Sequence, residues 1–111
     1  MTELPTVAKN VELIKGWFDV TLPKFLEEHN EESIKLLHVD CDLYSSTKTV
    51  FGNLKDRIVP GTVIVFDEFF NYPGWKEGEY KAFMEFIDET GYKFEYLGYV
   101  EIMEQVAVRI I

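Results

Sequence analysis

The chain has 111 residues, 47% of them hydrophobic and 15% aromatic, which is enough to fold as a single domain over residues 1–111 around one core. Its formal net charge of −9 disfavours nucleic acid and anionic membrane surfaces as partners and favours a bound cation. The single cysteine, Cys41, excludes an intrachain disulfide, and no apolar run reaches membrane-spanning length. Since MTELPTVAKN lacks a signal-peptide pattern, we expect a cytoplasmic protein.

The first half of the chain alternates strand and helix signals. Residues 11–14 are predicted to form a short strand. Thr21 is predicted to cap a helix that carries Pro23 in its first turn. Residues 33–39 are predicted to form a strand buried on both faces, with His38 as a core histidine.

The second half continues this alternation. A helix capped by Ser45 or Ser46 is predicted to bury an apolar stripe of Val50, Phe51, Leu54 and Ile58. The β-branched run 62–66 predicts another buried strand. A helix over about 77–90, ended by Gly91, is predicted to point four residues inward: Tyr80, Phe83, Met84 and Ile87. Residues 92–100 and 105–111 are predicted to pair as a hairpin.

The order β-α-β-α-β-α-β-β predicts an α/β fold. We expect a mostly parallel sheet with helices on both faces and a carboxyl-terminal antiparallel hairpin. In such sheets, ligands bind beyond the carboxyl ends of the strands.

Two acidic pairs follow two consecutive strands. Asp40 and Asp42 end the first strand, and Asp67 and Glu68 end the second. Carboxylate oxygens of this kind suit Mg²⁺, Ca²⁺ or Mn²⁺. Because the chain has only two histidines, a zinc site is disfavoured. The structural alternative for Asp42 is that it caps the following helix.

Other residues near these pairs have more ordinary explanations. Cys41 has no nearby base to make it a nucleophile. Among the aromatic residues, Phe66 is predicted to lie in the core, whereas the loop residues 69–75 are predicted to face a ligand.

Three stretches carry a resemblance to a known family. HVDCDLYSST, PGTVIVFDEF and the earlier VELIKGWFDVTLP together resemble the macrocin O-methyltransferase family of class I S-adenosylmethionine-dependent methyltransferases, over about residues 11–90. That family methylates sugar hydroxyls on natural-product glycosides and depends on a divalent metal. The resemblance therefore implies a Rossmann-like sheet, S-adenosylmethionine and Mg²⁺ as cofactors, and a small-molecule hydroxyl acceptor.

The resemblance also implies roles for individual residues. Asp40, Asp67 and Glu68 match the family's metal ligands, with Glu68 standing where aspartate is usual. Asp42 matches the general base. The loop Gly16-Trp17-Phe18 matches the segment that lies against the cofactor. Asp40 and Cys41 are also implied to contact the cofactor, and Cys41 stands where the family has glycine.

One departure from the family is large. The sequence has no glycine-rich cofactor loop, so the chain looks like the carboxyl-terminal half of a methyltransferase that lacks the first two strands. The strand at residues 34–40 is then expected to have an open edge, which predicts a homodimer, a swapped assembly or a rearranged sheet.

Two other functions stay open on the sequence alone. The D-x-D pattern also resembles phosphatases with an aspartyl nucleophile, although Tyr44 stands where they carry threonine or valine. The third alternative is a non-catalytic remnant or metal-binding module.

Overall fold

The protein forms a two-layer α/β structure. The computed structural model describes residues 6, 8–14, 16–29, 32–41, 43–70, 72–100 and 104–111. Within them the chain runs in the order α1 (Phe18–Glu28), β1 (Leu36–Val39), α2 (Tyr44–Leu54), β2 (Val63–Phe66), α3 (Glu79–Thr90), β3 (Phe94–Tyr99) and β4 (Val106–Ile110). Short 3₁₀ turns follow α2 and precede α3. None of the described helices has the length and apolar character that crossing a membrane requires.

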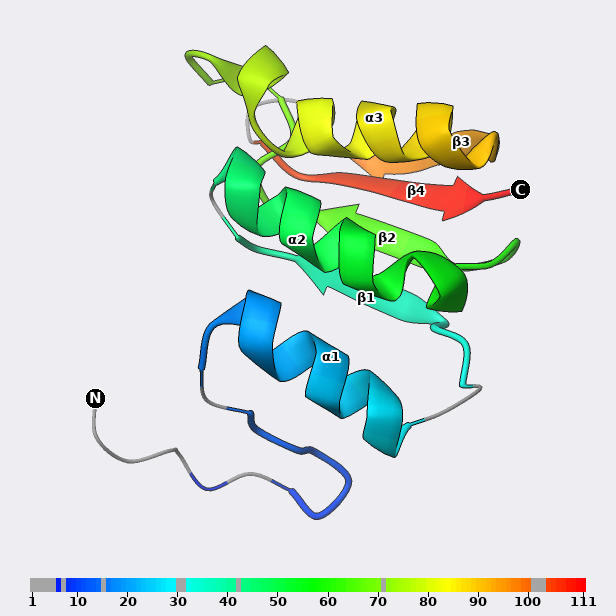
Figure 1. Ribbon diagram of the computed structural model, residues 1–111. Coiled ribbons are helices and arrows are strands. Elements are labelled where there is room, and N and C mark those ends of the chain that lie inside the picture. Colours follow the sequence, from blue (N-terminus) through cyan, green and yellow to red (C-terminus); the bar gives the residue numbers. More distant parts are fainter. Residues whose placement is uncertain are drawn as a thin grey trace.

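The four strands form one mixed sheet in the order β1-β2-β4-β3. β1 and β2 are parallel, and β4 pairs antiparallel with both β2 and β3. The predicted closing hairpin is therefore confirmed. Its second strand lies between β2 and β3 (Figure 1).

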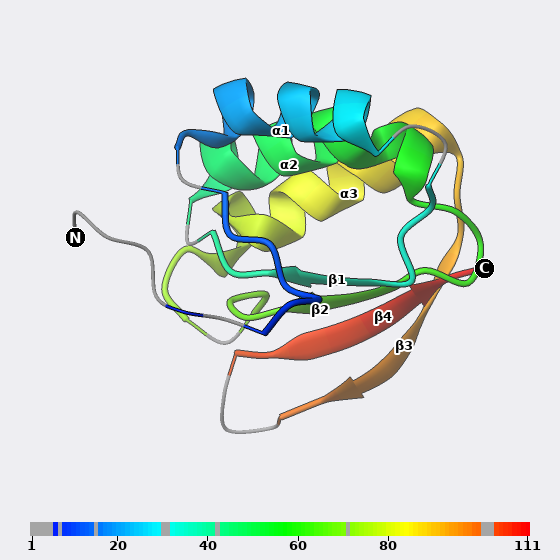
Figure 2. The ribbon, with the colours of Figure 1, turned by 90° about the horizontal axis from the view of Figure 1, so that it is seen from below.

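The helices do not cover both faces of the sheet, and that prediction is wrong. Figure 2 shows α1, α2 and α3 together on one face. As a result β1 is buried on one side only: Val39 is 2% exposed and Leu36 is 64% exposed. The side chain of His38 is 57% exposed, so His38 is not the predicted core histidine. Alternate residues of a strand point to opposite faces, and here one face has no helix over it.

The predicted strand at residues 11–14 is also wrong. These residues are irregular, and Val11, Leu13 and Ile14 are substantially exposed. A strand needs a neighbour to satisfy its backbone groups, and no described segment pairs with residues 11–14. In the described part of the chain β1 therefore lies at the edge of the sheet, with one side unpaired, as expected.

The core lies between the sheet and the helices α2 and α3. The predicted stripe of α2 is confirmed, because Val50, Phe51, Leu54 and Ile58 are all buried. β4 alternates as expected, with every second residue buried: Val106, Val108 and Ile110. α1 contributes no fully buried residue, although Leu22 and Leu26 pack against the core.

Two helices begin earlier than their hydroxyl residues predicted. α1 starts at Phe18, and the Thr21 hydroxyl donates to the Trp17 carbonyl at 3.0 Å instead of capping the helix. α2 starts at Tyr44, with Leu43 as its N-cap. Neither helix has a side-chain cap.

Gly91 ends α3 in the left-handed conformation, at φ 73°. We expect Gly91→Ala to lower the free energy of unfolding by about 1–2 kcal/mol, because a Cβ is disfavoured at this φ. Gly52→Ala is the matched control, since Gly52 lies inside α2 with open space at its Cβ position. That variant is expected to stabilise the protein by roughly 0.5–1 kcal/mol. Urea denaturation measures both changes, and equal effects would contradict the cap assignment.

Candidate functional site

Two of the predicted acidic residues meet at the carboxyl ends of β1 and β2. Val39 is paired with Phe66, so Asp40 and Asp67 are the next residues on two adjacent parallel strands. The Asp67 amide donates to the Val39 carbonyl at 3.0 Å, which extends the ladder to the acidic residues themselves. Asp40 is exposed, and the Asp67 side chain is 32% exposed. Asp42 lies outside the described residues. We call this rim of Asp40, Asp67 and Glu68 the acidic edge.

The Asp67 carboxylate has neighbours on both adjacent strands. Gln105, just before β4, donates its Nε2 to Asp67 Oδ1 at 3.4 Å. His38 Nε2 lies 4.0 Å from the same oxygen, on the exposed face of β1. Asp67 is thus oriented by its neighbours and remains accessible from solvent.

A buried carboxyl group, Glu79, links the two strand ends from behind. It is fully buried in the first turn of α3. Its Oε1 accepts the Glu68 amide at 3.0 Å, and its Oε2 accepts the Cys41 amide at 3.4 Å. One side chain therefore holds the backbone that follows Asp40 and the backbone that follows Asp67.

The environment of Glu79 is already rich in negative charge. Burial raises the pKa of Glu79 to about 7, and the charges of Glu68 and Asp40 act in the same direction. The two backbone amides oppose this rise by favouring the ionised form.

Glu79 was not predicted, because the predicted inward stripe of α3 is displaced by one residue from the stripe that is buried in the structure. The fully buried residues of α3 are Glu79, Ala82, Phe83 and Phe86. Of the predicted inward residues only Phe83 is among them, and Tyr80, Met84 and Ile87 are partly buried. The signal was present in the sequence, since Glu79 stands at the i, i+3, i+4, i+7 spacing of an apolar stripe.

Cys41 is half-buried beside this group. Burial, and then the Glu79 charge, raise the pKa of its thiol. The thiol is therefore protonated at neutral pH, which agrees with the expectation that Cys41 is not a nucleophile.

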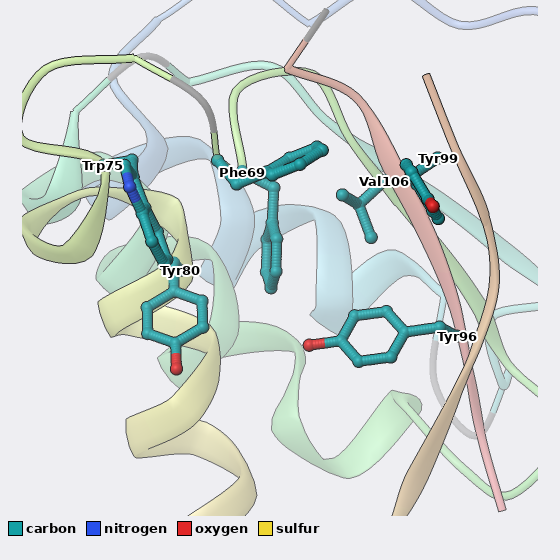
Figure 3. Close-up of a pocket in the computed structure, with 7 residues that line it drawn as sticks. Phe69, Trp75, Tyr80, Tyr96, Tyr99 and Val106 are labelled. Atoms are coloured by element: carbon teal, nitrogen blue, oxygen red, sulfur yellow. The ribbon is translucent and has the colours of Figure 1, made fainter. Parts of the chain in front are cut away.

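An aromatic pocket of about 330 Å³ lies on the helix face, beyond the end of β2 (Figure 3). It is lined by Phe69, Phe70, Trp75, Tyr80, Tyr96, Tyr99 and Val106. Phe66 is fully buried in the core, as predicted. The loop residues Phe69, Phe70 and Trp75 line this cavity, and Phe69 also belongs to the buried core. That this loop faces a ligand stays a prediction. Tyr96 and Tyr99 were not predicted.

The proposed cofactor loop lines a second hollow, of about 530 Å³. On one side this hollow is lined by Trp17, Phe18 and Asp19. On the other side it is lined by residues at the start of α2, namely Leu43, Ser45, Ser46 and Thr49. Gly16 has φ 143°, and a Cβ at this position would lie 2.6 Å from Thr21 Cγ2. The turn that presents Trp17, which is 82% exposed, therefore depends on glycine.

Among the described residues, one set of side chains has ligand atoms close enough together to hold a metal ion, and it lies away from the acidic edge. Ligand atoms of Glu12, Glu28 and His29 all lie within 4.8 Å of one another on the surface near α1. The described side chains of the acidic edge do not form such a set in their present rotamers. The two clusters are therefore separate candidates that binding experiments must distinguish.

Comparisons with known proteins find relatives of this chain both by sequence and by structure. The chain is 30% identical over 83 residues to demethyldecarbamoylnovobiocin O-methyltransferase of Streptomyces niveus, covering 73% of this chain and 30% of that protein. Two structures of CalS11 superpose with a TM-score of 0.68 at 27% identity. One is the apo form, described as a TDP-rhamnose 3'-O-methyltransferase of calicheamicin biosynthesis. The superpositions cover 86% of this chain and 39% and 36% of the CalS11 chains.

The chain thus spans about a third of the length of these relatives. The family model for macrocin O-methyltransferases (TylF) matches residues 3–92. Because this match includes most of the chain, with both strand ends of the acidic edge, the chain belongs to the macrocin O-methyltransferase family.

Proposed function

We propose that this chain provides the metal-binding and acceptor-binding part of an S-adenosylmethionine-dependent O-methyltransferase that acts on a hydroxyl group of a small natural product. The observation that carries the proposal is the acidic edge. Asp40 and Asp67 follow paired residues of adjacent parallel strands, and Glu79 holds both strand ends. Family membership supports the reaction type.

The residues of the acidic edge fit a hard divalent cation. Their donors are carboxylate oxygens, which suit Mg²⁺ better than zinc. Asp40, Asp67 and Glu68 would hold the ion. Burial is the main cause of the raised pKa of Glu79, and the negative charges of Glu68 and Asp40 add to it; a cation at this edge would offset those charges.

The chemistry follows from the weak nucleophilicity of an alcohol. When bound, S-adenosylmethionine supplies the methyl group and Mg²⁺ supplies Lewis acidity that lowers the pKa of the hydroxyl. Asp42 is the proposed general base that takes the hydroxyl proton. Asp40 and Asp67 would fix the position of the hydroxyl oxygen relative to that base.

Gly16, Trp17 and Phe18, with Asp40 and Cys41, are the proposed cofactor contacts. Their support is the hollow at the start of α2, whose walls combine an exposed indole with three hydroxyl side chains. An aromatic face and hydroxyl groups suit a nucleoside. A cytoplasmic location and a role in natural-product biosynthesis are parts of the same proposal.

The unpaired side of β1 is proposed to pair with a second copy of the chain. Its support is the edge position of β1 in the described sheet and the 64% exposure of Leu36. Light scattering measures the assembly directly. A monomeric mass, with slow amide exchange at residues 34–40, would contradict pairing.

Titration calorimetry with Mg²⁺ and with S-adenosylmethionine tests the proposed function. Binding of both supports the methyltransferase, and binding of Mg²⁺ alone supports a metal-binding module without activity. Hydrolysis of a phosphate ester would support the aspartyl phosphatase. Tyr44 disfavours that last function, because it stands where such phosphatases carry threonine or valine.

A further inference from the structure

Asp40 lies just beyond the last hydrogen bond between β1 and β2. That bond joins the Asp67 amide to the Val39 carbonyl at 3.0 Å. On its other side Asp40 is followed by Cys41, whose amide donates to Glu79 Oε2 at 3.4 Å. The backbone of Asp40 is therefore held by the sheet before it and by Glu79 after it.

The backbone of Asp67 is held in the same way. Its own amide belongs to the bonding between the strands, and the next amide, that of Glu68, donates to Glu79 Oε1 at 3.0 Å. The two oxygens of one carboxyl group thus connect the segments that carry Asp40 and Asp67. The position of Glu79 sets how far apart these two segments lie.

Glu79 is itself fixed by the core. It is fully buried in the first turn of α3, and α3 lies on the face of the sheet that the helices cover (Figure 2). Phe83, four residues further along the same side of α3, is also fully buried, and its ring centre lies 5.0 Å from that of Phe66. Phe66 directly precedes Asp67. The helix that carries Glu79 is therefore packed directly against the end of β2.

Stability of the fold alone is a poor explanation for a carboxyl group at this position. Burial disfavours the ionised form of Glu79, and the negative charges of Glu68 and Asp40 disfavour it further. A buried group that is costly in this way, next to a candidate site, is more often explained by a role in that site.

A rigid frame matters more for Mg²⁺ than for Ca²⁺. Mg²⁺ requires nearly octahedral ligands at about 2.1 Å, whereas Ca²⁺ accepts six to eight oxygens at about 2.3–2.6 Å in variable arrangements. Carboxylates that are free to move apart suit the larger ion. Carboxylates whose backbones are held at a fixed separation suit the smaller one.

We propose that Glu79 is a positioning residue that fixes the separation of Asp40 and Asp67 and thereby gives the acidic edge a preference for Mg²⁺ over Ca²⁺. The inference rests on the proposed function for the presence of a cation at this edge. Glu79 acts through the backbone of the two ligand segments and is not itself a ligand.

Two variants of Glu79 separate position from charge. Glu79→Gln keeps the length of the side chain but has one acceptor oxygen in place of two. Glu79→Asp keeps the charge but is one methylene too short to reach both amides. Each variant is expected to weaken Mg²⁺ binding about tenfold and Ca²⁺ binding less than about threefold, so the ratio of the two affinities falls at least about threefold.

Titration calorimetry with MgCl₂ and with CaCl₂ measures the ratio. The buffer is held at pH 8, above the pKa of Glu79, so that both carboxylate oxygens accept hydrogen bonds. A partial loss of folded protein lowers both affinities by the same factor, so a merely structural role does not change the ratio. Glu77→Gln is the control, because Glu77 is 75% exposed and pairs with Lys81. It removes the same charge just before α3 and is expected to leave the ratio unchanged.

The possible outcomes distinguish this inference from the proposed function. An unchanged ratio in both Glu79 variants would overturn the inference alone. A changed ratio in Glu79→Gln but not in Glu79→Asp would assign the effect to charge and would also overturn it. If the wild type binds neither ion, the proposed function fails and the inference fails with it.

Hydrogen exchange in the wild type provides a test that does not depend on the folding of any variant. The amides of Cys41 and Glu68 are expected to exchange as slowly as that of Asp67, because all three donate to protein acceptors. Rapid exchange at Cys41 and Glu68, with slow exchange at Asp67, would show that Glu79 does not hold the strand ends and would overturn the inference.

Discussion

Asp67→Asn is expected to weaken Mg²⁺ binding by at least about a hundredfold. Removing a group that only supports a metal ligand costs up to about a hundredfold in affinity, and removing a ligand itself should cost at least as much. Asparagine has the same shape and keeps an oxygen that accepts from Gln105, so the change removes charge and little else. Titration calorimetry measures the affinity. Methyl transfer by any active form of the protein should fall with it, because the same oxygen is proposed to hold the ion.

The unfolding midpoint separates this effect from a loss of structure. Asp67→Asn removes one negative charge from a crowded edge, so the metal-free protein should be at least as stable as the wild type. Glu12→Gln, in the other cluster of possible ligands, is the matched control and should leave the affinity unchanged. If Asp67→Asn binds Mg²⁺ as tightly as the wild type, the assignment of Asp67 as a ligand is wrong.

Glu79→Gln is expected to change how stability depends on pH. In metal-free buffer, the pKa of Glu79 is about 7 in the folded chain, against the ordinary value of 4.5. The folded state therefore favours the protonated carboxyl. The stabilisation of the folded state by this raised pKa is fully present below pH 4.5 and falls as pH rises toward 7. Above pH 7 it is lost and stability no longer changes through this group. Because a tenfold change in proton binding is worth about 1.4 kcal/mol, the loss is at most about 3 kcal/mol.

Chemical denaturation between pH 4.5 and 8 measures this effect as the difference between wild type and variant. The wild type should lose stability relative to Glu79→Gln as pH rises. Glu85→Gln is the matched control, since hydrogen bonds from Tyr44 and then Lys48 lower the pKa of Glu85. For Glu85→Gln the difference from the wild type should therefore stay nearly constant in this pH range, because the stabilisation from a lowered pKa is lost only as pH falls below 4.5. A pH-independent difference for Glu79→Gln would show that its carboxyl is not held in the protonated form.

The parts of the fold that were predicted correctly depend on local sequence patterns. The stripe of α2, the alternation of β4 and the glycine that ends α3 each follow from spacing or backbone conformation within one element. Two of the errors, the burial of β1 on both faces and that of His38, concern what lies across the sheet. Whether β1 is buried on one face or two depends on which helices cover it. The sequence around His38 is compatible with either arrangement, so the exposure of His38 could not be predicted from it.

The acidic edge was predictable because the carboxyl ends of adjacent parallel strands must meet. Glu79 and the tyrosines of β3 were not predicted, for two different reasons. Glu79 was missed because the predicted inward stripe of α3 was displaced by one residue, and a charged side chain is seldom buried. Tyr96 and Tyr99 share a face only through the bulge at Leu97, and a regular alternation assigns them to opposite faces.

Paramagnetic broadening by Mn²⁺ tests the central claim most directly, namely that the ends of β1 and β2 form one cation site. Substoichiometric Mn²⁺ is added to ¹⁵N-labelled protein, and the loss of each amide signal is followed. The amides of Asp40, Cys41 and Asp67 are expected to disappear first, and Asp67→Asn should restore them. Early loss of the Glu28 and His29 signals, with those of the strand ends intact, would contradict the account and assign the cation to the cluster near α1.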